Sequence, residues 1–242
     1  MSTNKPTIRL NVLAKHVENA REIVEAADGR VLIGVMVKAY PDVDAAAAAV
    51  ESFQRADVPV SVGLGAGDPT QWKKVAEVAA RTKPAHVNQV FPAAGYTLGR
   101  LQQAGSGDTL VNALIAPSGT PGRVIVSTGP VSGTWQETVS CEAAAAMLAE
   151  IGVHSVKFYP VNGCERLDEL RAMARAAVRC GLSVFEPTGG IDASSIRRVV
   201  ETCLEEGVQQ VIPHIYTSIV DKATGLTRTD QVKELIAALP HV

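Results

Sequence analysis

The stretch "SVKFYPVNG", residues 155–163, places a lysine inside what reads as a buried strand. Val156 and Phe158 are apolar, and Pro160 ends the run. Because a lysine is rarely buried unless another group pairs with it, Lys157 needs an explanation. The alternation of Lys157 with the apolar Val156 and Phe158 also fits a strand of a closed barrel. If Lys157 points into a barrel, Val156 and Phe158 point outward to a layer of helices, where apolar residues belong.

Similar apolar runs, rich in Val and Ile, recur along the chain. With the run around Lys157 they lie at 7–14, 31–38, 58–65, 85–91, 110–116, 154–159, 182–187 and 209–215. Such runs are typical of strands covered on both faces. Helical patterns separate most of them, for example at 16–27, 42–56, 69–81, 137–151, 166–180 and 192–206. Residues typical of N-caps precede several of these patterns, and glycines typical of C-caps follow others: Asp42, Asp68 and Asp192, then Gly152, Gly181 and Gly207.

Eight strands alternating with helices, with no Pro/Gly/Ser linker in 242 residues, predict one (β/α)8 TIM barrel domain spanning 1–242. The segment 117–136 departs from the pattern. Its strand-like core "RVIVSTG", between turn signals, predicts an elaborated loop after the fifth strand, such as a small hairpin. A doubly wound open sheet is the alternative, although no G-x-G-x-x-G follows the first strand and "GLGAGD" at 63–68 lacks that spacing.

The composition narrows the class of protein. A net charge of −2 and 4% aromatic residues argue against a nucleic-acid binder, which would show a basic face. The four cysteines lack C-x-x-C spacing, so neither a zinc ribbon nor a redox pair is indicated, and free thiols are expected. The first residues contain no apolar run typical of a signal peptide, and no stretch approaches the ~18–20 apolar residues of a membrane span. We expect a cytoplasmic protein that does not enter a membrane.

Two explanations of Lys157 compete. An inward lysine is either the salt-bridge partner of a barrel carboxylate or an amine nucleophile. An apolar barrel mouth disfavours the charged form and lowers the pKa of the amine, and a neutral amine attacks ketones to form a Schiff base. A pKa shift of about three units costs roughly 4 kcal/mol, which is large against a typical folding stability. A site of that kind is expected to serve a function.

The next strand adds a second feature. In "VFEPTGGID", residues 184–192, Glu186 stands at a strand end and Gly189-Gly190 lead toward a helix expected to begin at Asp192. A glycine pair before a helix lets backbone N–H groups approach an anion closely. In barrels the loops after strands seven and eight often hold phosphate. Together with Lys157, this predicts a phosphorylated carbonyl substrate.

"KFYP" at 157–160 and "EPTGGI" at 186–191 resemble the K-F-F-P and P-T-G-G-I motifs of the 2-dehydro-3-deoxy-phosphogluconate (KDPG) aldolases, class I Schiff-base lyases with (β/α)8 folds. Over nearly the whole chain, the sequence is similar to a branch of KDPG aldolase-like proteins associated with catabolism of sugar acids, including D-glucosaminate. Segments such as "IPHIYTSIVDKATGLTR" carry that similarity. The resemblance to the better-known enzymes is confined to the two motifs and the strand order.

The resemblance implies roles for particular residues. Lys157 matches the Schiff-base lysine, and Thr188, Gly189 and Gly190 match the phosphate-side loop. It implies a phosphorylated sugar-acid substrate, no cofactor and no metal, and association into a homo-oligomer. The sequence departs from the better-known enzymes at the proton shuttle. In those enzymes the shuttle is a glutamate near the end of strand two, but strand two here reads "GVMVKAYPD" and contains no glutamate. Glu186 is the replacement candidate, although it could instead hold the lysine in place.

Further residues are expected at the barrel mouth. His214 is a weaker candidate for the shuttle and is otherwise structural or positions the substrate. Lys38 binds the substrate carboxylate or is a solvated loop lysine. Asn88 orients a hydroxyl or satisfies backbone groups. Ser218 offers a hydroxyl to a phosphate or to a neighbouring subunit. Arg123 and Arg228 are further phosphate candidates, and "KATGLTR" at 222–228 is expected to be a lid or an oligomer contact.

The expected activity is cleavage of 2-dehydro-3-deoxy-6-phosphogluconate to pyruvate and glyceraldehyde 3-phosphate through a Schiff base on Lys157. 4-Hydroxy-2-oxoglutarate would use the same lysine chemistry. Two other functions stay open at this point. One is a metal-dependent class II aldolase with Glu186 and His214 as ligands. The other is a non-catalytic barrel that binds a sugar phosphate.

Overall fold

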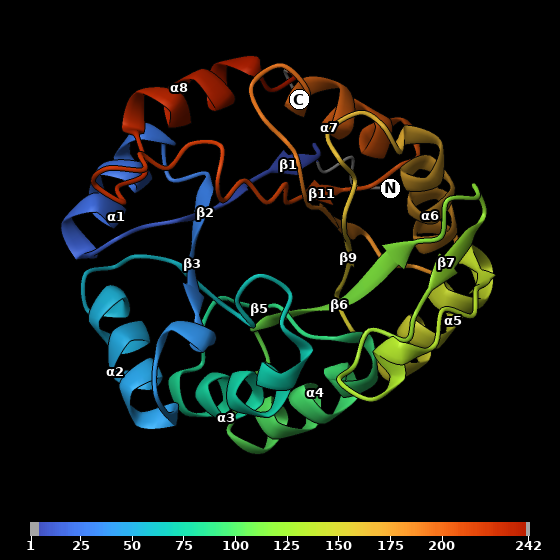
Figure 1. Cartoon of the computed structure of the whole chain (residues 1–242), viewed down its shortest axis with the longest axis horizontal. Helices are drawn as coiled ribbons and strands as arrows, with labels where there is room; N and C mark the ends of the chain where they lie inside the picture. The colour runs from blue at the N-terminus through green and yellow to red at the C-terminus, as the bar shows by residue number, and fades with distance from the viewer. Residues whose placement is uncertain (1–4, 241–242) are drawn as a thin grey trace.

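A computed structural model describes residues 5–240, in which strands surround a central axis and helices surround the strands (Figure 1). The strands are β1 (Thr7–Ile8), β2 (Leu10–Leu13), β3 (Val31–Met36), β4 (Val60–Gly63), β5 (His86–Val87), β6 (Leu110–Pro117), β7 (Arg123–Ile125), β8 (Val139–Ser140), β9 (Ser155–Phe158), β10 (Val184–Pro187) and β11 (Gln210–Val211). All eight predicted strands are present, most of them shorter than predicted. Residues 1–4 and 241–242 of the predicted 1–242 domain lie outside the described residues.

Helices follow most of the strands. They are α1 (Val17–Ala26), α2 (Val43–Gln54), α3 (Trp72–Thr82), α4 (Ala94–Gln103), α5 (Cys141–Ile151), α6 (Leu167–Arg179), α7 (Ile196–Glu205) and α8 (Thr229–Ala238). Short 3₁₀ helices are η1 (Val37–Ala39), η2 (Pro69–Gln71), η3 (Phe91–Ala93) and η4 (Ser132–Thr134). Within the described residues, no helix is both long and apolar enough to cross a membrane.

The sheet closes on itself through the first predicted strand. Arg9 divides this strand into β1, which pairs in parallel with β11, and β2, which pairs in parallel with β3. The remaining order is β11-β10-β9-β6-β5-β4-β3. The amide of Asn11 donates to the carbonyl of Pro213 at 2.9 Å, which continues the closure beyond β1. This ring confirms the TIM barrel and excludes the open doubly wound sheet.

The segment after β6 forms the predicted hairpin. β7 pairs antiparallel with β6, and β8 pairs antiparallel with β7. The predicted helix at 137–151 was therefore placed too early, because Val139 and Ser140 belong to β8. The helix α5 begins at Cys141, and the Ser140 hydroxyl accepts the amide hydrogen of Ala143 at 3.1 Å as its N-cap.

Other helix boundaries also differ from prediction. Asp42 caps α2 as expected, accepting from the amide of Ala45 at 2.8 Å. The helix predicted to begin at Asp192 instead begins at Ile196, because Asp192 caps an intervening turn and accepts from the amide of Ser195 at 3.0 Å. Residues 222–228 lead directly into α8, whose N-cap position is Arg228.

Two apolar layers and one polar layer form the interior. Val156 and Phe158 are fully buried between the sheet and the outer helices, as their strand parity predicts. Inside the barrel a small separate cluster of Leu32, Val184 and Ile212 closes one end. The next inward positions are polar and buried, so each needs a hydrogen-bond partner.

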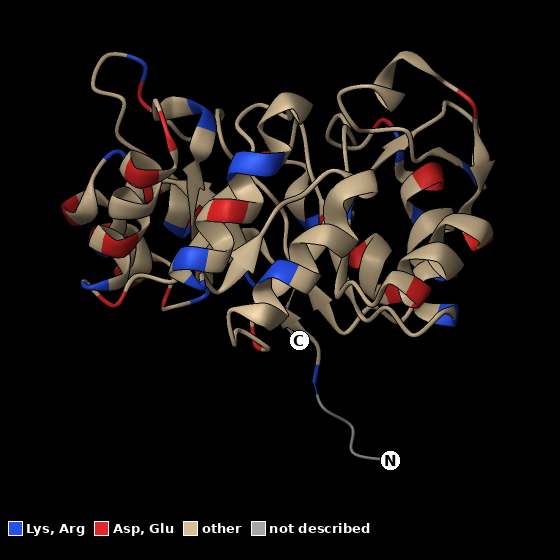
Figure 2. Cartoon of the chain, turned by 90° about the horizontal axis from the view of Figure 1, so that it is seen from below, with Lys and Arg blue, Asp and Glu red and all other residues tan. Residues whose placement is uncertain are grey.

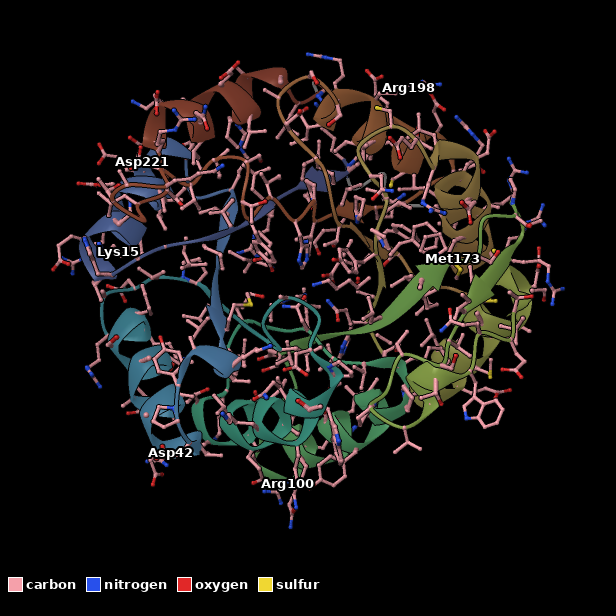
Figure 3. The ribbon with its side chains drawn as sticks, in the orientation of Figure 1. Lys15, Asp42, Arg100, Met173, Arg198 and Asp221 are labelled. Carbon is pink, nitrogen blue, oxygen red and sulfur yellow. The ribbon has the colours of Figure 1, made fainter. Side chains whose placement is uncertain are left out.

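Lys and Arg are interspersed with Asp and Glu over the helices visible in Figure 2. Figure 3 shows Lys15, Asp42 and Arg198 at the outer rim and Met173 inside the ring of helices.

Candidate active site

A cavity of about 310 Å³ lies at the carboxyl ends of the barrel strands, where TIM barrels carry their active sites. Strand and loop residues from around the ring line it. They include Met36, Gly65, Ala66, Gly67, Asn88, Leu114, Lys157, Tyr159, Thr188, Gly189, Gly190, His214, Tyr216, Thr217 and Ser218. The structure thus gathers six of the predicted site residues besides Lys157 at one cavity. Lys38 and Glu186 are not among its lining residues.

Lys157 lies on β9 and points into the barrel, in register with Leu114 of β6 and Glu186 of β10. Its Nζ donates to Oδ1 of Asn88 at 3.0 Å and contacts Nδ1 of His214 at 3.2 Å. Burial lowers the pKa of the amine to about 8, against the opposing attraction of Glu186. Lys157 makes no ion pair with a carboxylate of the described chain, so the salt-bridge explanation of this lysine has no partner.

Glu186 is fully buried and does not line the cavity. Its Oε1 accepts from Nε2 of His86 at 2.9 Å, and its Oε2 accepts from Nε2 of His214 at 2.8 Å and from Nδ2 of Asn112 at 2.6 Å. Burial alone would raise the pKa of this carboxyl group, but the electrostatic attraction of the His86 ring and the hydrogen bonds from His214 and His86 outweigh burial and hold the pKa well below its ordinary value. The carboxylate is therefore an ionised, enclosed acceptor that does not reach the cavity.

The carboxylate determines the tautomer of His214. An ionised carboxylate only accepts hydrogen bonds, so Nε2 of His214 carries the hydrogen that it donates to Glu186. Burial and the neighbouring charge of Lys157 lower the pKa of His214 to about 3, which keeps the ring neutral. The other nitrogen, Nδ1, then carries no hydrogen, and its lone pair can accept one. It faces Nζ of Lys157 at 3.2 Å and the hydroxyl of Tyr216 at 2.9 Å.

His86 contacts the other carboxylate oxygen of Glu186, and it too donates from Nε2 and accepts at Nδ1. Nε2 of His86 donates to the carboxylate, and Nδ1 of His86 lies 2.8 Å from the hydroxyl of Ser61. That hydroxyl already accepts from the side-chain amides of Asn11 and Asn88, each at 2.9 Å. Its one hydrogen is therefore left to donate to His86. Every member of the network has a partner, which is the condition for a stable buried polar cluster.

Sequence reasoning missed most of this polar layer. It singled out Asn88, Glu186 and His214, but it did not identify their buried partners Asn11, Ser61, His86 and Asn112. A signal was available, because each of these four is a polar side chain within a predicted strand run. Inward parity and burial together mark such residues as members of a shared network.

The predicted phosphate loop forms one wall of the cavity. Gly189 and Gly190 both have positive φ, at 102° and 67°. A Cβ on Gly190 would lie 2.9 Å from the amide nitrogen of Gly163, so only glycine fits there. The amides of Gly189 and Gly190 have no acceptor among residues 5–240. Because α7 starts only at Ile196, an anion here would meet loop amides and not a helix N-terminus.

Thr188 and Ser218 stand beside this wall. The Thr188 hydroxyl donates to the carbonyl of Glu186 at 3.2 Å, and the Ser218 hydroxyl donates to the carbonyl of Ile191 at 3.2 Å. Opposite them, Gly65, Ala66 and Gly67 form a second turn with three consecutive positive φ angles. The Tyr159 ring lies close to both turns, near the Cβ positions of Gly67 and Gly189.

The remaining predicted cations lie away from the cavity floor. Lys38 forms an ion pair with Asp68 at 3.0 Å, and 56% of its side chain is exposed. Arg123 lies on β7 and donates to the hydroxyl of Thr138 at 2.7 Å. Arg228 borders a neighbouring open hollow, together with Thr217 and Ser218.

No three His, Cys, Asp or Glu side chains of the described residues are arranged to hold a metal ion. His86 and His214 approach opposite oxygens of Glu186 and do not converge on a common point with it.

The barrel is similar to solved structures of low sequence identity, which show the fold alone. KGPDC of Streptococcus mutans is 11% identical with a TM-score of 0.61, covering 96% of this chain and 97% of that one. A mutant tryptophan synthase α-subunit of Pyrococcus furiosus is 14% identical with a TM-score of 0.59, covering 97% of both chains.

Two sequence comparisons identify the family. A curated relative, the 2-dehydro-3-deoxy-phosphogluconate aldolase of Salmonella typhimurium (strain 14028s / SGSC 2262), is 46% identical over 231 residues, covering 95% of this chain and 93% of the relative. The model of the KDGP aldolase family matches residues 4–223. Matches of this extent show that the chain belongs to the KDGP aldolase family, which confirms the expected family and the expected carbon–carbon lyase.

Proposed function

We propose that the protein is a class I aldolase that cleaves 2-dehydro-3-deoxy-6-phosphogluconate to pyruvate and glyceraldehyde 3-phosphate through a Schiff base on Lys157. The observation that carries the proposal is the environment of Nζ. This amine has a pKa lowered to about 8, lines the cavity that joins most of the predicted site residues, and has no carboxylate counter-ion in contact.

The hydrogen bonds of Lys157 leave its reactive position free. A neutral amine has two hydrogens and one lone pair. Asn88 Oδ1 and His214 Nδ1 accept the two hydrogens, so the lone pair is left for the carbonyl carbon of a substrate in the cavity. With a pKa of about 8, about a tenth of the amines are neutral at pH 7, against about 0.04% at the ordinary value. Burial thus raises the population of nucleophile by more than two orders of magnitude.

The reaction then follows from the electron sink that the iminium provides. Nζ adds to C2, water leaves, and a cationic iminium links Lys157 to the substrate. Loss of the C4 hydroxyl proton breaks the C3–C4 bond, releases glyceraldehyde 3-phosphate and leaves a neutral enamine. Protonation of C3 restores the iminium, and water then releases pyruvate and the free amine. Atoms and charges balance without any other reactant.

The buried carboxylate supports the cationic intermediate. Glu186 is in register with Lys157 on the neighbouring strand, and it is the negative charge that raises the pKa of that amine. The iminium of a lysine is a protonated Schiff base that can lose its N–H proton, and the nearby carboxylate favours the protonated, cationic form through the cationic steps. In a site of low dielectric, such an attraction is stronger than in water.

The substrate phosphate is assigned to the turn formed by Thr188, Gly189 and Gly190, with Ser218 beside it. Amides without internal acceptors and glycines that permit close approach are what an anion of this size requires. The curated relative's name, 2-dehydro-3-deoxy-phosphogluconate aldolase, supports a phosphorylated sugar acid as the substrate. 4-Hydroxy-2-oxoglutarate, which lacks the phosphate, is proposed as a poorer second substrate.

Borohydride reduction in the presence of pyruvate tests the nucleophile. We expect inactivation and a pyruvyl-derived mass on the peptide that contains Lys157. Labelling of another lysine, such as Lys38, would contradict the assignment. Exhaustive chelation tests the class II alternative, because an iminium mechanism needs no Lewis acid. Activity lost on chelation and restored by zinc, manganese or magnesium would favour that alternative.

A further inference from the structure

The Schiff-base reaction leaves one role without a residue. A group must take the proton of the C4 hydroxyl, and a group must deliver a proton to C3. Strand β3 supplies no base, because its inward positions are Leu32, Gly34 and Met36. Glu186 is buried away from the cavity and holds three hydrogen bonds. The proton carrier must therefore be sought among the groups that line the cavity.

Four titratable side chains of the described residues line it: Lys157, Tyr159, His214 and Tyr216. Lys157 is consumed by the covalent bond to C2. Burial and the charge of Glu186 raise the pKa of Tyr216 far above its ordinary value, so its hydroxyl is a poor base. Tyr159 lies at the rim with 38% of its surface exposed. His214 alone places a bare lone pair within hydrogen-bond distance of the reacting nitrogen.

We propose that Nδ1 of His214 takes the proton from the C4 hydroxyl and returns it to C3, with Glu186 and His86 as the positioning residues. The inference rests on the proposed Schiff-base function. In the first step the O–H bond and the C3–C4 bond break, and the electron pair of the C3–C4 bond neutralises the iminium. In the second step the new N–H bond of His214 breaks as the C–H bond at C3 forms. One proton passes from oxygen to carbon, and the imidazole ends neutral.

The electrostatics of the site match this transfer. The charge of Lys157 is one reason that His214 is a weak base in the free protein, where its pKa is about 3. Carbon–carbon cleavage removes the positive charge from Nζ at the moment when the proton reaches His214. The positive charge therefore moves 3.2 Å, from Nζ to the ring, and stays beside the carboxylate of Glu186. The histidine becomes a stronger base as the reaction requires it.

The buried layer keeps His214 in the reactive tautomer. Glu186 holds the hydrogen on Nε2, and His86 holds the other carboxylate oxygen. Ser61 in turn orients His86 through Nδ1. None of Ser61, His86 and Glu186 lines the cavity, so they act through His214 and not on the substrate.

The experiment compares His214→Gln with His86→Gln in the full-length protein. A glutamine at either position can still donate to Glu186, but His214→Gln removes the lone pair that faces the cavity. Three quantities are measured: the borohydride-trapped pyruvate adduct, the exchange of pyruvate methyl hydrogens with deuterium oxide, and cleavage of the phosphorylated substrate. Exchange requires both the Schiff base and a proton carrier, whereas trapping requires the Schiff base alone.

For His214→Gln we expect a normal yield of adduct, with exchange and cleavage each slowed by at least about 10²-fold. For His86→Gln we expect a loss of less than about tenfold in both. Exchange near the wild-type rate in His214→Gln, or equal losses in the two variants, would overturn the role of His214. Failure to trap an adduct on Lys157 in the wild-type protein would instead contradict the Schiff-base function.

Two further measurements keep the proposal open to refutation if His214→Gln does not fold. Nitrogen-15 NMR of the wild-type protein, which has five histidines, should show His214 with a protonated Nε2 and a bare Nδ1. The opposite tautomer would overturn the proposal. In Glu186→Gln, kcat should fall by about 10²-fold or more, and by much more than the adduct yield, which also depends on the attraction between Glu186 and the cationic iminium. A parallel loss of adduct and cleavage would show that Glu186 serves Lys157 and not His214.

Discussion

Two lysines at the barrel mouth, which come from strands that three others separate, differ in exposure and in the groups that they contact. Lys38 follows β3 in the short helix η1, is mostly exposed and pairs with Asp68 at 3.0 Å. Lys157 lies within β9, is partly buried, and is held by two uncharged acceptors, Asn88 and His214. The first lysine thus has a carboxylate in direct contact. Burial without such a contact makes the second a nucleophile.

The difference shows how the same side chain acquires a function from its surroundings. Desolvation disfavours the charged amine, and a direct counter-ion would cancel that effect. The barrel keeps its one nearby negative charge, Glu186, in register with Lys157 but hydrogen-bonded to two histidines and Asn112. The carboxylate is thus close enough to support a cation and too occupied to form an ion pair with the amine.

The largest effect is expected for Lys157→Ala. Removing the nucleophile should reduce cleavage by roughly 10⁴-fold or more and abolish borohydride trapping. The far-ultraviolet circular dichroism and the midpoint of urea unfolding serve as controls, and both should remain close to those of the wild type. Substantial residual cleavage with a trappable adduct would mean that another lysine, Lys38 included, is the nucleophile.

Gly190→Val should produce the next largest effect, and it tests whether the turn at Gly190 holds the phosphate. A side chain would clash with the amide of Gly163 and shift the turn. We expect the KM for the phosphorylated substrate to rise by about tenfold or more, equivalent to about 1.4 kcal/mol of binding. The KM for 4-hydroxy-2-oxoglutarate should change far less. Equal increases for both substrates would remove the phosphate from this turn, and Gly190→Ala provides a milder variant should valine impair folding.

The pH dependence of adduct formation should separate a buried amine from an exposed one. Protonated lysine is unreactive, so below the pKa of about 8 the trapping rate with pyruvate should rise about tenfold for each pH unit. Above that value the amine is already neutral, and the rate should level off. A rate that keeps rising toward the ordinary lysine pKa would show that burial does not activate Lys157.

The smallest effect is expected for Lys38→Ala. An exposed ion pair contributes about 0–1 kcal/mol, so stability should change little. Since Lys38 does not line the cavity, the KM and kcat should each change by less than about threefold. A tenfold rise in the KM for both 2-dehydro-3-deoxy-6-phosphogluconate and 4-hydroxy-2-oxoglutarate would instead indicate that Lys38 binds the substrate carboxylate.

The sequence alone determined the order of the barrel. Val- and Ile-rich runs are a local property of strands covered on both faces, and each of the eight runs became a strand. Strand parity correctly turned Lys157 inward, and a glycine pair after the seventh run indicated the turn at Gly189 and Gly190. The boundaries were less accurate, because one residue decides where pairing or capping begins. Asp192 caps a turn and not a helix, and Ser140 belongs to β8 before it caps α5.

Tertiary structure decided which inward residues meet, and at what depth. His86 and Glu186 are 100 residues apart, and Asn88 and Lys157 are 69 residues apart, yet each pair is in contact. The alternation of side chains along a strand predicts which of them point into the barrel. Their height along the barrel axis depends on the stagger between neighbouring strands, which the sequence pattern does not give. In the folded barrel His214 lines the cavity, whereas Glu186 is buried away from it. The tautomer of His214, and with it the lone pair that faces Lys157, exists only because the closed ring brings a buried carboxylate against Nε2.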